Sequence, residues 1–304
     1  MAGGGDSTRA IFFALGANFA IAVSKGVAAF FTGSSAMLAE TVHSLADCGN
    51  QLLLLLGMRQ AKRPPSPDYP LGYGKAIYFW SFLVALMLFS VGGMFSLYEG
   101  IHKLQHPEPL KQWWWAAGVL VFGIVAEAFS MRACMQEVNK ARGSRTLWQW
   151  FRQSRQAELV VIFGEDLAAL FGLVFALVAV ILSVVTGNPL WDAIGTIAIG
   201  ALLVVVAVFV AVEVKAMLIG QSVDPQREQE MRHFIEAREE VGRVISLITL
   251  QLGNEVMVAI QAEMSERQTA HHLAEEINRV ERAFKAQFPE VRWSFFEPDL
   301  KPQV

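Results

Sequence analysis

Charged residues are scarce in this chain. Asp, Glu, Lys and Arg make up 17% of its 304 residues, whereas soluble domains average about 25%. The formal net charge of −3 is too small to indicate nucleic acid or another polyanion as a partner. Apolar residues reach 54% and the mean hydropathy is +0.38, so the composition indicates an integral membrane protein with a smaller soluble part.

Cysteine and nucleotide-binding motifs are also scarce or missing. The two cysteines, Cys48 and Cys134, lie in apolar surroundings and support neither a disulfide framework nor a thiolate zinc site. The chain has no Walker A, GxGxxG or His-Glu-x-x-His motif, which argues against ATP-driven transport and against a zinc-dependent hydrolase. We expect no cofactor. Residues 1–9 are small and polar, and we expect neither a secretory signal nor a transit peptide there.

Six apolar stretches are long enough to cross a bilayer as helices, since about 20 residues suffice for one crossing. They predict an all-α transmembrane domain over residues 1–220, a multi-pass protein in contact with the lipid bilayer. The expected spans are residues 10–31, 36–58, 76–101, 113–135, 159–186 and 190–218.

Lys and Arg gather in two of the loops between these spans. The loop after the second span carries Arg59, Lys62 and Arg63, and the connection before the fifth span is basic too. Because basic loops stay in the cytoplasm, both termini are predicted to be cytoplasmic, in a cell (inner) membrane. The second of these connections also carries Trp148, Trp150 and Phe151, which is typical of a helix that rests at the level of the lipid headgroups.

Residues 221–304 have a different composition and predict a small cytoplasmic α+β domain, with helices on one face of a sheet. Gly253-Asn254 separates two β-branched or alternating runs and indicates a hairpin. The expected order is helix, strand, strand, helix, strand, over residues 225–238, 244–252, 256–264, 271–288 and 291–296.

Two short stretches place polar side chains at bilayer depth, where a carboxylate costs about 2.5–3.5 kcal/mol on insertion scales. The first runs from His43 to Asp47 and the second is Glu165-Asp166. His43 and Asp47 are four residues apart, so they share one helix face, and Asn50 lies on it as well. An imidazole and a carboxylate on one face make half of a four-coordinate metal site.

Other interpretations of these residues remain open at this point. His43 or Asp47 could bond a neighbouring helix, and the acids of the fifth span could pair with Lys25 or Lys75. Neighbouring helical residues point about 100° apart, so periodicity does not decide between Glu165 and Asp166. Three further acids, interpreted as structural groups close to span ends or facing a cavity, are Glu99, Glu127 and Glu213.

The chain resembles the cation diffusion facilitator family of divalent metal/proton antiporters over nearly its whole length. The branch that contains the mitochondrial zinc exporter is the most similar in detail, through Gly49-Asn50-Gln51 and Phe163-Gly164-Glu165-Asp166. The other motifs that carry the resemblance are Asn18 with Lys25, Gly33-Ser34-Ser35-Ala36, His43-Ser44-Leu45-Ala46-Asp47, Pro70-Leu71-Gly72-Tyr73-Gly74-Lys75, Asn188-Pro189-Leu190-Trp191-Asp192 and Glu297-Pro298.

The resemblance implies export of a divalent transition-metal cation as substrate, in exchange for protons, by alternating access. It implies His43, Asp47 and Asp166 as ligands, with Glu165 a fourth ligand or a proton carrier. Ile162 stands where the usual zinc transporters have a histidine, so the ligand set is harder than usual. Zn2+ is the first choice, Fe2+, Mn2+ and Co2+ are alternatives, and a membrane metalloprotein that does not transport is a further one.

The resemblance also implies a ferredoxin-like fold for the cytoplasmic domain and a homodimer. Gln261 and Phe295 stand where many relatives place zinc-binding histidines, whereas His271 and His272 remain at the start of the last helix. We therefore do not expect a regulatory zinc cluster there, and dimerisation is expected to rest on apolar packing.

Overall fold

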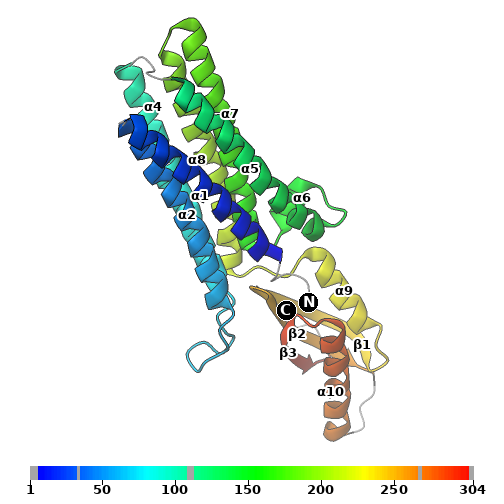
Figure 1. Cartoon of the computed structure of the whole chain (residues 1–304). Coiled ribbons are helices and arrows are strands. Elements are labelled where there is room, and N and C mark those ends of the chain that lie inside the picture. The colour runs from blue at the N-terminus through cyan, green and yellow to red at the C-terminus, as the bar shows by residue number, and fades with distance from the viewer. Residues whose placement is uncertain (1–5, 33–34, 108–112, 266–268, 301–304) are drawn as a thin grey trace.

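Long helices build the first two thirds of the chain and a small sheet with two helices builds the rest (Figure 1). The computed structural model describes all residues except 1–5, 33–34, 108–112, 266–268 and 301–304. Several side chains in the first two helices, including that of His43, also lie outside this description. The same holds for part of the Gly33 to Ala36 motif.

Six helical segments correspond to the six expected spans. In chain order they are α1 (Asp6–Thr32), α2 (Ser35–Ala61), the continuous run α3 (Ala76–Met87), η1 (Leu88–Met94) and α4 (Phe95–Gln105), then α5 (Trp113–Arg142), α7 (Ala157–Thr186) and α8 (Leu190–Ile219). Among the described residues, five of these segments are long and apolar enough to cross a membrane. The remaining one, α2, carries Asp47, Asn50 and Gln51 and packs along α1.

Large apolar side chains cover the outside of this bundle. Their contact with water would be unfavourable, whereas contact with lipid is not. Phe12 and Phe19 on α1, Phe129 on α5 and Phe209 on α8 are all exposed. Exposed apolar surface on this scale marks contact with a membrane or a partner. The expectation of a multi-pass membrane domain is confirmed.

The C-terminal part has the expected order of elements. They are α9 (Pro225–Glu236), β1 (Val241–Leu252), β2 (Glu255–Met264), α10 (Ala270–Gln287) and β3 (Val291–Pro298). The sheet order is β1-β2-β3, with β1 antiparallel and β3 parallel to β2. Alternate residues of β2 are buried with Ile235 of α9 and Phe284 of α10, so both helices pack on one face of the sheet.

The connection before α7 differs from the expectation. A short helix, α6 (Leu147–Gln153), forms there with a Thr146 capping box. Trp150 is buried and its ring meets Phe163 of α7 edge-on, while Phe151 is buried beside it. Only Trp148 of the three aromatics is exposed. The expected headgroup-level helix is therefore wrong for two of its aromatics, because α7 begins early enough to offer them an apolar face.

Candidate functional site

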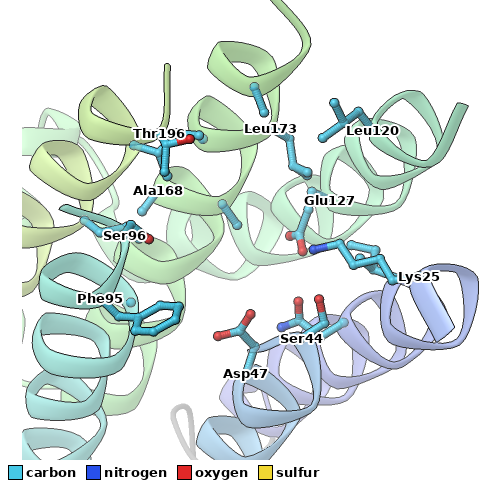
Figure 2. A pocket seen from close by; sticks show the side chains of 18 of the residues that line it. Lys25, Ser44, Asp47, Phe95, Ser96, Leu120, Glu127, Ala168, Leu173 and Thr196 are labelled. Carbon is cyan, nitrogen blue, oxygen red and sulfur yellow. The ribbon is translucent and has the colours of Figure 1, made fainter. Parts of the chain in front are cut away.

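A cavity of about 330 Å3 lies inside the helix bundle, between α1, α2, α3 to α4, α5, α7 and α8. Asp47, Glu165 and Asp166, three of the predicted ligands, line this one cavity. They lie on two helices, α2 and α7, and Asp47 and Asp166 are 119 positions apart in the sequence. Figure 2 shows Asp47 pointing into the open space of the cavity from α2.

Glu165 joins α7 to α2. Its Oε1 accepts a hydrogen bond of 3.1 Å from Nδ2 of Asn50, and its Oε2 accepts one of 2.7 Å from Nε2 of Gln51. All three side chains are buried. Two amide donors therefore hold both carboxyl oxygens of Glu165 in place, as buried polar atoms normally require.

Asp166 faces a different neighbour. Its Oδ2 accepts a hydrogen bond of 2.9 Å from the Ser130 hydroxyl of α5, and 1% of the residue is exposed. The adjacent acids of α7 thus point apart, one towards α2 and one towards α5, and both still border the cavity.

The predicted half-site on α2 is only partly described. Asp47 is half-buried at the cavity wall, and Ser44 lines the cavity one turn earlier. His43 belongs to the α2 backbone, but its side chain lies outside the described residues. Within the described part of the chain, no group of three or more His, Cys, Asp and Glu side chains is close enough to hold a metal ion.

Glu127 was expected near a span end or facing a cavity, and the structure has it at the cavity. It lies midway along α5, which continues to Arg142. The residue is 2% exposed and lines the cavity. Lys25 of α1 lines it too, and its nitrogen points towards the Glu127 carboxylate (Figure 2).

Glu99 and Glu213, the other acids interpreted as structural, have different surroundings. Glu213 of α8 is buried and forms an ion pair with Arg152 of α6. Glu99 lines the cavity at its outer end, where Lys103 lies 3.5 Å from it and 3.1 Å from Asp192. Lys75, proposed as a partner of the α7 acids, is not among the residues that line the cavity.

The cavity extends towards one end of the bundle only. Its lining continues past Leu173 to Lys103, Asp192 and Thr196, at the end of the bundle opposite the sheet domain (Figures 1 and 2). On the other side an apolar cluster closes the bundle, with Leu54, Tyr78 and Val161 among its buried members. Ile162 is fully buried in this cluster and does not line the cavity.

Cys48 and Cys134 are both buried and free. In the sheet domain, Gln261 donates a hydrogen bond of 2.9 Å to Asp299, and Phe295 is exposed. His271 and His272 lie within 3.4 Å and 3.2 Å of Glu275 and Glu276 on the same helix.

Fold and site define a polytopic membrane protein with carboxylates around a central cavity. In a comparison with known protein families, residues 11–219 match the cation efflux transmembrane domain. The chain therefore belongs to the cation efflux family, the cation diffusion facilitators, and its similarity falls in the branch of the mitochondrial zinc exporter. The family consists of transporters and not of enzymes.

Three relatives illustrate this similarity. The mitochondrial proton-coupled zinc antiporter SLC30A9 of Xenopus laevis is 36% identical over 215 residues, which are 70% of this chain and 38% of the relative. Metal tolerance protein C4 of Arabidopsis thaliana is 32% identical, over 75% of this chain and 50% of its own length. The cation-efflux pump FieF of Klebsiella pneumoniae is 28% identical over 93% and 89% of the two chains. This chain thus spans about two fifths of the length of its SLC30A9 relative.

Proposed function

We propose that this chain exports a divalent transition-metal cation, with Zn2+ as first choice, in exchange for protons. The observation that carries the proposal is the cavity in which acids of α2, α5 and α7 meet inside a membrane bundle. Buried ionisable groups in such a bundle mark an ion pathway by default. Several relatives are named as proton-coupled zinc antiporters, which supports the same function.

The ligands that we propose are His43, Asp47 and Asp166, with Glu165 a fourth ligand or a proton carrier. One nitrogen and two or three oxygens form a hard set, which leaves Fe2+, Mn2+ and Co2+ as alternative substrates. Glu165 accepts hydrogen bonds from both Asn50 and Gln51, which supports it as the less mobile acid. Asp166 accepts one, from Ser130, so it has fewer hydrogen bonds to break when it binds an ion.

Exchange for protons follows from the chemistry of such ligands. Imidazole and carboxylates bind a metal only when deprotonated, so binding releases protons and protons displace the metal. Alternating access would move helix pairs around a site near the bilayer midplane. The cavity reaches only the end of the bundle opposite the sheet domain, which supports an outward-open conformation as the one described here.

Orientation and assembly are further parts of the proposal. The basic loops lie at the same end of the bundle as the sheet domain (Figure 1), so the positive-inside rule places that domain and both termini in the cytoplasm of a cell membrane. A homodimer is supported by Ile248 and Phe295, two large apolar residues that are exposed in the sheet domain. Chemical cross-linking in membranes followed by mass determination tests the dimer.

A metal panel tests the substrate. The chain is reconstituted in liposomes that hold a metal-sensitive dye, and uptake of Zn2+, Fe2+, Mn2+ and Co2+ is measured for wild type and for Ile162→His. Ile162 packs in the apolar cluster one turn before Asp166, outside the cavity wall. A histidine there supplies a second nitrogen when the helices rearrange during alternating access, and the preference is then expected to shift towards Zn2+ at least about tenfold, because imidazole suits Zn2+. An unchanged preference, with the variant still transporting, would contradict the role given to Ile162.

A further inference from the structure

Glu127 is a buried acid of the cavity that the proposed ligand set leaves without a task. It lies at the middle of α5, it is 2% exposed, and it lines the same cavity as Asp47 and Asp166. Burial, and after it the charges of Asp166 and Asp47, make an ionised Glu127 costly without a positive charge nearby. The effective cost of burying an ion is several kcal/mol even in real proteins.

Lys25 supplies that positive charge. It is 8% exposed on α1, it is among the residues that act on Glu127, and its nitrogen points towards the Glu127 carboxylate (Figure 2). Lysine carries its charge on a flexible four-carbon stem. Among the described residues, Lys25 and Lys103 are the lysines that line the cavity, and Lys103 lies at the outer end.

We propose that Lys25 is a tethered counter-cation that competes with the transported cation for Glu127. The inference rests on the proposed function and adds to it. Without cargo, Lys25 neutralises Glu127; an arriving divalent ion has twice the charge and draws Glu127 into its own coordination, while the lysine stem swings away. Lys25 thereby weakens binding enough for the ion to leave again, which a transport site requires.

A second feature of the cavity favours a cation at this place. Oδ1 of Asn50 is buried without a hydrogen-bond partner among the described groups, and Asn50 is 3% exposed and lines the cavity. Buried polar atoms are normally paired. An amide oxygen is a ligand that divalent cations accept, so Asn50 can add an oxygen beside the carboxylates that Lys25 and the cargo share.

The rival explanation is a structural one, in which Lys25 and Glu127 only hold α1 against α5, which are neighbours in the bundle. The two explanations differ in whether Glu127 is needed. Removal of a structural lysine would lower stability and would change metal affinity by the same factor with or without Glu127. Removal of a competing cation would instead raise metal affinity, and it would do so only while Glu127 is present.

Calorimetric titration of the purified full chain with Zn2+, at fixed pH and ionic strength, separates them. Lys25→Met is expected to bind Zn2+ about tenfold more tightly than wild type, the range that coupled charge pairs show. In a Glu127→Gln background the same change is expected to alter affinity less than about twofold. The matched control is Lys140→Met, which removes a lysine 2.9 Å from the buried Glu137 of α5, outside the cavity, and is expected to leave affinity unchanged.

Contrary results have distinct meanings. If wild type binds Zn2+, Asp47→Ala does not, and Lys25→Met behaves like Lys140→Met or binds more weakly, the inference is overturned and the proposed function stands. If wild type binds no divalent ion of the panel, the proposed function itself fails. Should Lys25→Met not fold, Lys25→Gln replaces it, with the same expected increase, and an unchanged affinity there overturns the inference equally.

Discussion

The two adjacent acids of α7, Glu165 and Asp166, accept hydrogen bonds from different helices. Glu165 accepts from Asn50 and Gln51 of α2, while Asp166 accepts from Ser130 of α5. The sequence could show that both acids are at bilayer depth, because hydropathy alone reveals that. It could not show which helices they face, since this depends on how α2, α5 and α7 pack. The donors, which set the position of each carboxylate, were therefore beyond sequence reasoning.

Gln51 gives a test at this scale. Gln51→Leu removes the 2.7 Å donor to Oε2 of Glu165 and leaves that oxygen buried. A buried acceptor left without its partner costs about 1–3 kcal/mol in the metal-free chain. A bound cation would relieve that cost, so we expect Zn2+ affinity in calorimetry to rise by about five- to a hundredfold. Gln60→Leu, on the same helix but bonded to Trp80, is the control and should leave affinity unchanged. Equal affinities of both variants would contradict the role of Gln51.

Helix ends and irregularities decide what a side chain can do. The six spans could be located from hydropathy to within a few residues, and so could the helices and strands of the sheet domain. The packing of α5 against its neighbours, and not its length, brings Glu127 to the cavity. The π-helical turns of η1, which bring Leu88 and Gly92 to the cavity wall, leave no signal in hydropathy because π-helices depend on tertiary packing.

Close packing of α4 against α8 is the element-scale feature that a substitution can test. A Cβ at Gly200 of α8 would lie 2.7 Å from the backbone nitrogen of Leu97, so the two helices touch through a small residue. Gly200→Ala is expected to lower stability in detergent by about 1–3 kcal/mol, the usual effect of overpacking. Thermal unfolding followed by circular dichroism measures this.

A matched glycine provides the control for that change. At Gly118 of α5 a Cβ would meet nothing within 4 Å, and alanine is the better helix former. Gly118→Ala is expected to leave the melting temperature unchanged or to raise it slightly. If both variants melt alike, the close α4 to α8 contact does not contribute as the structure indicates.

At the scale of the whole molecule, the cavity has one open end and one closed end. The sheet domain docks at the closed end, where the backbone amide of Gly253 in the β1–β2 turn donates a 2.9 Å hydrogen bond to the Tyr78 hydroxyl of α3. Gly74 meets the same turn so closely that a Cβ would lie 2.1 Å from the Leu252 carbonyl oxygen. Movement of α3 and movement of the sheet domain are therefore mechanically linked. No local sequence pattern predicts this contact, which joins residues 175 positions apart.

Thiol labelling tests the direction of the opening. In a chain whose buried Cys48 and Cys134 are replaced by serine, Leu120→Cys places a thiol on the cavity wall. We expect a membrane-impermeant reagent to label it from the outside. Val161→Cys, in the apolar cluster with 2% of the residue exposed, should stay unlabelled. Labelling of Leu120→Cys from the cytoplasmic side alone would reverse the proposed orientation.

Proton-coupled export is the central claim, and one flux measurement tests it most directly. Liposomes that contain the chain and a zinc-sensitive dye are given Zn2+ outside, with and without an imposed pH gradient. We predict that Zn2+ uptake rises at least about tenfold when the liposome interior is more acidic than the outside. Protons from the interior then protonate the ligands and displace the bound ion inwards, and they leave the liposome in exchange. Asp47→Ala should abolish this uptake. Uptake that ignores the gradient would rule out antiport, and uptake that survives Asp47→Ala would contradict the site.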